Sequence, residues 1–86
     1  MINFEELKKS SMPIEGACPG VYLLFSENEL VYVGHSWNCL LRVSENTRKD
    51  SRKKFVRWNF IAIEDEAERK KIACEIISNY KPLYNT

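Results

Sequence analysis

The chain has 86 residues, 44% apolar and 29% charged, with a formal net charge of +1. This length predicts one compact domain spanning residues 1–86, and the composition is that of a globular protein rather than a disordered or fibrous one. No apolar run approaches the ~20 residues of a membrane span, and the start MINFEELKKS lacks the apolar stretch of a secretory signal, so we expect a cytoplasmic protein.

Three cysteines, Cys18, Cys39 and Cys74, are far apart and lack paired metal-ligand spacing. A disulfide framework or a zinc site is therefore not expected.

The N-terminal segment, residues 1–19, is predicted to be a helix followed by a connector. Asn3 can cap the helix, with Glu6 three positions later completing a capping-box pattern. The helix should break before Pro13, because the following SSMPIEGACPG is rich in proline and glycine.

Residues 20–34, GVYLLFSENELVYVG, predict a β-hairpin with strands at about 21–25 and 30–33. An odd-numbered loop would place five apolar residues on one face: Val21, Leu23, Phe25, Val31 and Val33. The same register would bring Tyr22 and Tyr32 together on the other face. An even loop would separate the two tyrosines.

A helix is predicted next, capped by Ser36 or Asn38 and reaching about Asn46. Its sheet-facing stripe follows helical spacing and comprises Trp37, Leu40, Leu41 and Ser44. Residues 55–63 predict a third strand, with one face formed by Val56, Trp58, Phe60 and Ala62. Trp58 is interpreted as a packing residue.

The last helix is predicted from the acidic turn at Glu64 to about Asn79, before Pro82 ends it. Its buried stripe should comprise Ile72, Ala73, Ile76, Ile77 and Tyr80. Taken alone, Glu75 is a surface residue beside that stripe. The element order predicts an α+β fold, a three-stranded antiparallel sheet flanked by helices.

Positive charge is concentrated between Arg42 and Arg57, where seven basic residues meet two acidic ones. This segment is either a solvated loop or a surface that binds nucleic-acid phosphates. For the second interpretation, the candidate residues are Arg48, Lys49, Arg52, Lys53, Lys54 and Arg57.

The motifs of the hairpin and of the helices that follow it, taken in their order along the chain, resemble those of the GIY-YIG nuclease superfamily. Gly20-Val21-Tyr22 and Tyr32-Val33-Gly34 match the two halves of the name motif, and Ser36 and Asn38 precede Arg42 on the next helix. The sequence KPLYN, residues 81–85, closes the domain, so the resemblance covers residues 19–85.

The resemblance implies roles for particular residues. Tyr22 and Tyr32 would be the paired active-site tyrosines, Arg42 would face the phosphate, and Glu75 would bind the metal, with Asn85 in support. Two positions depart from common versions of the pattern. His35 stands where the excision-repair branch carries lysine, and Asn46 stands where histidine or tyrosine is frequent.

Phosphodiester hydrolysis needs an activated water and neutralisation of charge on the phosphate. One carboxylate, Glu75, would suffice to hold a single Mg²⁺ or Mn²⁺ ion, and Arg42 offers a planar fork for phosphate oxygens. Tyr22 could act as the base only if its pKa fell or if it relayed the proton, and His35 could receive that proton. Tyr32 would orient water or phosphate.

The function predicted on this basis is a metal-dependent endonuclease that cuts DNA with low intrinsic sequence specificity. Specificity would then come from DNA structure, a partner protein or a homodimer, since no separate reader domain is expected. The first alternative is a nucleic-acid-binding module of the same fold without useful turnover. The second is an interaction domain that binds no nucleic acid.

Overall fold

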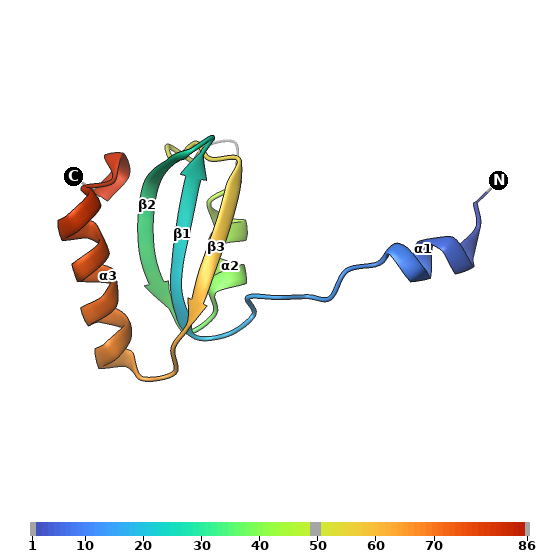
Figure 1. Ribbon diagram of the computed structural model, residues 1–86, viewed down its shortest axis with the longest axis horizontal. Helices are drawn as coiled ribbons and strands as arrows, with labels where there is room; N and C mark the ends of the chain where they lie inside the picture. The colour runs from blue at the N-terminus through green and yellow to red at the C-terminus, as the bar shows by residue number, and fades with distance from the viewer. Residues whose placement is uncertain (1, 49–50, 86) are drawn as a thin grey trace.

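The structure, a computed structural model, describes residues 2–48 and 51–85. A three-stranded antiparallel sheet lies between two helices, and a separate N-terminal helix extends away from it (Figure 1). The elements are α1 (Phe4–Ser10), β1 (Gly20–Ser26), β2 (Glu29–Ser36), α2 (Cys39–Glu45), β3 (Arg57–Ala62), α3 (Glu66–Tyr80) and a 3₁₀ turn (Leu83–Asn85). The strand order is β2-β1-β3, so the predicted fold class is confirmed.

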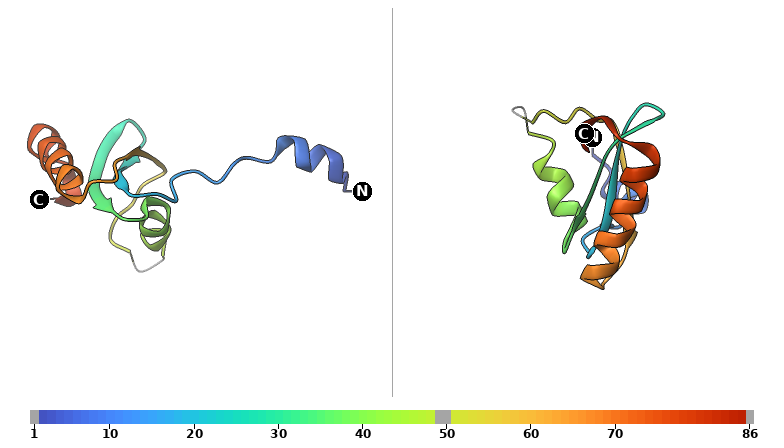
Figure 2. Two further views of the ribbon diagram at one scale, coloured as in Figure 1. Left: turned by 90° about the horizontal axis from the view of Figure 1, so that it is seen from below. Right: turned by 90° about the vertical axis from the view of Figure 1, so that its left-hand side faces the viewer.

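Each face of the sheet is covered by one helix, as the edge-on view in Figure 2 shows. On the α2 side, Tyr22 and Leu24 of β1 pack with Cys39 and Val43. On the α3 side, the buried residues are Val21, Val33 and Ala73. The central strand β1 therefore contributes to both cores, because its side chains alternate between the two faces.

The hairpin turn differs from the prediction. It contains two residues, Glu27 and Asn28, and not an odd number. A β-bulge compensates, because Leu24 pairs with Tyr32 whereas Phe25 pairs with Leu30. This shift leaves Val31 as the additional residue, and an additional residue reverses the alternation beyond it.

Because of the bulge, Tyr32 lies on the predicted face of the sheet, whereas Val31 does not. Tyr22 and Tyr32 share a face as predicted, although the reason given, an odd loop, was wrong. Val31 was expected beside Val33, but it is buried on the α2 side with Leu24. A sequence that matches two patterns of alternation does not by itself indicate where a bulge occurs.

The helix caps agree with the prediction. The Asn3 side chain accepts a hydrogen bond from the backbone N–H of Glu6 (3.2 Å), and the Asn38 side chain accepts one from Leu41 (3.1 Å). In α3, which begins slightly later than predicted, Asp65 caps by accepting from Glu68 (2.9 Å). Short polar side chains at these positions satisfy N–H groups that have no partner within the helix.

Several expected core positions are exposed. The buried residues of α2 are Cys39 and Val43, so the predicted stripe of Trp37, Leu40, Leu41 and Ser44 was displaced around the helix. The helix begins only at Cys39, which leaves Trp37 in the preceding turn.

The predicted buried faces of β3 and α3 were wrong for the residues at the ends of these elements. On β3, Trp58 and Phe60 are half-buried on the α2 side, but Ala62 is exposed, as is Val56, which precedes the strand. On α3, Ala73 is buried as predicted, whereas Tyr80, the last residue of the helix, is 70% exposed.

The N-terminal arm, residues 2–15, projects from the domain and ends in α1 (Figure 1). None of the α1 residues is buried, and Phe4 and Leu7 are 72% and 58% exposed. From Gly16 onward the chain joins the domain, since the carbonyls of Gly16 and Cys18 accept hydrogen bonds from Leu40 (2.8 Å) and Cys39 (3.0 Å). Across residues 2–48 and 51–85, no helix is both long and apolar enough to cross a bilayer.

Candidate functional site

A cleft of about 700 Å³ lies along the β2 edge of the sheet, between α2 and α3. β2 is an edge strand, so side chains from both faces of the sheet reach this cleft. Its polar lining residues are Tyr22, Tyr32, His35, Arg42, Glu45, Asn46, Lys53, Lys70 and Asn85. We call it the tyrosine cleft.

The two tyrosines come from neighbouring strands. Their ring centroids are 6.1 Å apart with an interplanar angle of 39°. Gly34 makes room for this pair, because a Cβ atom at that position would overlap the ring and hydroxyl of Tyr22. The second glycine of the hairpin motif therefore has a steric role.

Burial raises the pKa of Tyr22 from 10.0 to about 12, and the adjacent Tyr32 adds to the rise more than Arg42 opposes it. Burial disfavours the charged phenolate, because the protein interior solvates it poorly. At neutral pH the Tyr22 hydroxyl is therefore protonated and available as a hydrogen-bond donor. The lowered pKa that a directly acting base would need is absent from this structure.

Helix α2 contributes Arg42, Glu45 and Asn46 to the cleft. The Arg42 guanidinium lies 3.6 Å from the Glu45 carboxylate and is well exposed to solvent. The Asn46 side chain donates a hydrogen bond to the backbone carbonyl of Arg42 (3.0 Å) and so completes the end of the helix. Arg42 is thus free to turn toward an anion, since an exposed ion pair contributes little stability.

Asn85 stabilises the strand that carries the site. Its side chain accepts from the N–H of Val33 and donates to the carbonyl of the same residue, both at 2.9 Å. These two bonds imitate one residue of a neighbouring strand along the β2 edge. The supporting role predicted for Asn85 is consistent with this contact.

Lysines from two other elements enter the cleft. The Lys53 Nζ atom lies 4.7 Å from the centroid of the Tyr32 ring, within cation–π range. Lys70 of α3 is also a lining residue and forms an exposed ion pair with Glu66 at 3.5 Å. Neither lysine was predicted to lie beside the tyrosines.

The other basic candidates have different positions. Arg48 and Lys54 join Lys53 in a second depression next to the tyrosine cleft, and Arg52 is exposed. Arg57 instead binds the hairpin turn, donating to the Glu27 carbonyl and the Asn28 side chain. Lys49 lies outside the described residues.

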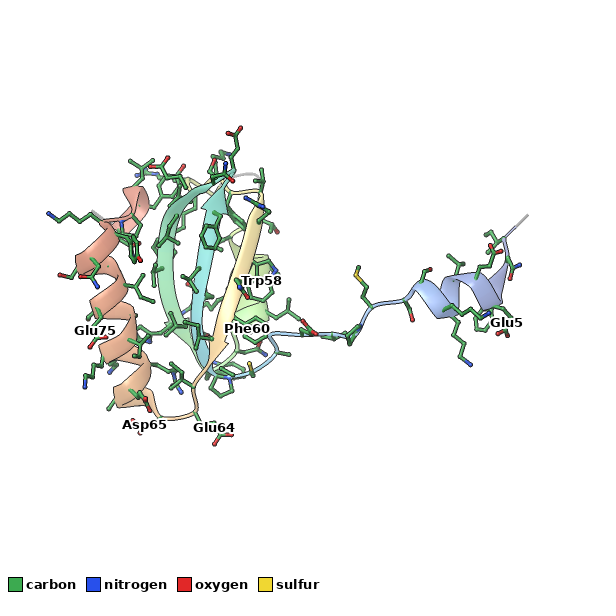
Figure 3. All side chains as sticks on the ribbon, in the orientation of Figure 1. Glu5, Trp58, Phe60, Glu64, Asp65 and Glu75 are labelled. Atoms are coloured by element: carbon green, nitrogen blue, oxygen red, sulfur yellow. The ribbon has the colours of Figure 1, made fainter. Side chains whose placement is uncertain are left out.

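Glu75 does not reach the tyrosine cleft. It is exposed and lines a separate depression on α3 with Asp65, Glu68 and Lys71, and Figure 3 shows it apart from the strands. The cleft-lining residues of α3 are Lys70, Ala73, Cys74 and Ile77. The expected convergence of Glu75 with Tyr22, Tyr32 and Arg42 is therefore wrong.

The geometry of α3 explains this. Each helical residue advances by about 100°, so Glu75 points about 200° away from Ala73. Ala73 is buried against the sheet with Val21 and Val33. That contact fixes the rotation of the helix and directs Glu75 to solvent.

Glu75, the carboxylate that the sequence suggested for the magnesium site, does not line the tyrosine cleft. Glu45 is the cleft's one carboxylate among the described residues, and it faces Arg42. In residues 2–48 and 51–85, no three His, Cys, Asp or Glu side chains are grouped so that they could hold a metal ion. The tyrosine cleft is instead rich in cations and hydroxyl donors, a combination that suits an anion.

The fold has close counterparts among solved structures. The GIY-YIG N-terminal endonuclease domain of UvrC from Thermotoga maritima, bound to magnesium, has a TM-score of 0.71 at 20% identity, covering 99% of this chain and all of that one. A point mutant of that domain bound to its catalytic divalent cation has a TM-score of 0.69 at 19% identity, covering 96% and 97%.

A curated relative matches in sequence. UvrABC system protein C of Anaplasma phagocytophilum (strain HZ) is 30% identical to this chain over an aligned length of 91 residues. The match covers 95% of this chain. The chain spans 15% of the length of that relative. No protein-family model matches the chain.

Proposed function

Because the chain has the GIY-YIG domain fold, we propose that its tyrosine cleft binds a phosphodiester of the DNA backbone. The observation that supports this most directly is the set of groups in the cleft. Arg42, Lys53 and Lys70 line the same cleft as Tyr22 and Tyr32, while Glu75 lies elsewhere. The domain would then bind nucleic acid in this cleft, and a metal ion held by Glu75 would not take part in cleaving it.

Each group has a distinct task in this model. The Arg42 guanidinium exchanges its ion pair with Glu45 for two phosphate oxygens, which match its planar fork better. Tyr22 and Tyr32 donate hydroxyl protons to the phosphate, and the raised pKa of Tyr22 keeps it a donor at neutral pH. Lys53 and Lys70 provide charge without fixed geometry.

The basic residues beside the cleft extend this surface. Arg48 and Lys54 share the adjoining depression with Lys53, so one strand of DNA could place a second phosphate there. Such contacts carry no base information, and the model accordingly implies low sequence specificity. A partner protein or a second copy of the chain would then determine which DNA site is bound.

Metal-dependent cleavage of DNA is the second candidate. It is favoured by the divalent cation bound to the structurally similar endonuclease domain. In the described part of this chain, the carboxylate available in the cleft for that purpose would be Glu45. This candidate predicts Mg²⁺- or Mn²⁺-dependent nicking of supercoiled plasmid that chelator and Glu45→Gln abolish.

Two neighbouring lysines provide a matched test of the binding proposal. Lys70 lines the tyrosine cleft, whereas Lys71, next in sequence, lines the depression that contains Glu75. We expect Arg42→Ala and Lys70→Ala to weaken binding of a fluorescent DNA oligonucleotide at low salt, measured by anisotropy. Charge-assisted contacts of this kind contribute about 1.5–3 kcal/mol, or roughly 10- to 150-fold in affinity.

Lys71→Ala removes the same charge outside the cleft, and Glu75→Gln tests the outer carboxylate. Neither variant should weaken binding. Equal losses for Lys70→Ala and Lys71→Ala would show that only net charge matters and would refute the cleft as the binding site. Metal-dependent nicking by the unaltered protein would replace the binding function with the second candidate.

A further inference from the structure

Trp37 is 68% exposed although it is a large aromatic residue. It occupies the turn between β2 and α2, and its spacing had indicated a core residue. Burial of a tryptophan side chain would stabilise the fold by several kcal/mol, and an exposed Trp37 contributes little of that free energy. The turn therefore presents a large aromatic surface to solvent.

The turn that carries Trp37 is held on both sides. The Ser36 hydroxyl accepts a hydrogen bond from the N–H of Asn38 (3.0 Å) and donates to its carbonyl (3.2 Å). Ser36 itself is buried, and Asn38 caps α2. The backbone at Trp37 is thus fixed, so the indole is displayed at little further entropic cost to a ligand.

Trp37 is two residues from His35, a lining residue of the tyrosine cleft. His35, two residues earlier, is exposed and lines the cleft, while Gly34 and Ser36 on either side of it are buried. Trp37 follows His35 by two residues, so their Cα atoms lie within about 7 Å of each other. A polynucleotide leaving the cleft past His35 would meet the indole within one nucleotide.

We propose that Trp37 is a stacking platform for an unpaired nucleobase next to the phosphodiester held in the tyrosine cleft. This inference rests on the proposed function and specifies its ligand class: DNA with at least one unstacked base, as in a single strand, a flap or a junction. A base inside an intact duplex has both faces stacked and could not contact the indole.

The other tryptophan cannot play this role. Trp58 is half-buried on β3 and packs against Phe60, with ring centroids 5.5 Å apart. It therefore serves as a structural control within the same chain. Because the chain has two tryptophans, Trp58→Phe leaves Trp37 as the sole indole for fluorescence.

The test compares Trp37→Ala and Trp37→Phe with the unaltered protein for a single-stranded thymidine oligonucleotide and for a blunt duplex of the same length. We expect Trp37→Ala to weaken single-strand binding about 5- to 150-fold, the range for one stacked base, and to leave duplex binding unchanged. Trp37→Phe should retain most of the affinity. In Trp58→Phe, the oligonucleotide should quench the fluorescence of Trp37.

Trp37→Ala should also keep the melting temperature of the unaltered chain, since the side chain is exposed. Unchanged single-strand affinity, an equal loss for both DNA forms, or no quenching at saturation would overturn the stacking platform. If Arg42→Ala still weakened binding in that case, the phosphodiester proposal would stand. If the protein bound neither DNA form, both proposals would fall.

Discussion

Tyr22 illustrates how its surroundings change the chemistry of a residue. Its position in the hairpin motif suggested a base, which requires an accessible phenolate. The structure buries its ring between Leu24, Cys39 and Val43, with Tyr32 beside it. Burial, and to a smaller extent Tyr32, raise the pKa of Tyr22 to about 12, so its hydroxyl is better suited to donate a hydrogen bond than to remove a proton.

This pKa predicts a particular dependence of stability on pH. Folding raises the pKa of Tyr22 from 10.0 to about 12, so the native state retains the proton more tightly than the unfolded chain. The resulting stabilisation is complete below about pH 10 and is lost as the pH rises toward 12. Chemical unfolding at several pH values should show this loss for the unaltered chain and a smaller one for Tyr22→Phe.

Tyr80→Phe is the control, because Tyr80 is exposed on α3. Near-ultraviolet tyrosinate absorbance should also show one phenol that ionises last and disappears from the titration of Tyr22→Phe. If Tyr22→Phe lost stability over the same pH range as the unaltered chain, another group would be responsible.

Among the elements, β2 depends most on side-chain support. It is an edge strand, and both backbone groups of Val33 are satisfied by Asn85. An unpaired polar group in a buried setting costs about 1–3 kcal/mol. The 3₁₀ turn that carries Asn85 therefore fastens the C-terminus to the strand that lines the cleft.

Asn85→Ala should lower the free energy of unfolding by about 2 kcal/mol or more, because it removes the partners of both Val33 backbone groups. Urea denaturation would measure the change. Asn79→Ala, at an exposed position late in α3, removes the same amide and should have little effect. Similar losses for the two variants would contradict the role assigned to Asn85.

At the scale of the whole molecule, the arm and the domain are structurally separate. The helix α1 buries none of its residues, whereas Gly16 and Cys18 are hydrogen-bonded to the start of α2. Gly16 also adopts a positive φ of 85° close to the Trp58 ring. The domain therefore begins at about Gly16.

Removal of residues 2–12 should change the melting temperature by less than about 2 °C, since it deletes no buried side chain. Removal of residues 2–17 also deletes the hydrogen bond from Leu40 to Gly16 and should cost about 1 kcal/mol or more. Circular dichroism melts of the two shortened chains would separate these cases. A large effect of the first deletion would mean that α1 packs on the domain in solution.

Local sequence patterns determined much of this protein. Asn3, Asn38 and Asp65 fix helix starts through short-range hydrogen bonds, and alternating apolar residues define the strands. The order of these elements sufficed for the fold. The prediction that Tyr22, Tyr32 and Arg42 would share one cleft was confirmed, but the two tyrosines face the same side only because of the bulge in β2.

Only the tertiary structure decided which side of each element faces that cleft. The bulge at Val31, the exposure of Trp37, the rotation of α3 and the pKa of Tyr22 depend on contacts between residues far apart in sequence. For α3, packing of Ala73 on Val21 and Val33 turns Glu75 away from the tyrosines. Helical spacing gives the relative directions of side chains, but the rotation of a helix against a sheet is set by packing.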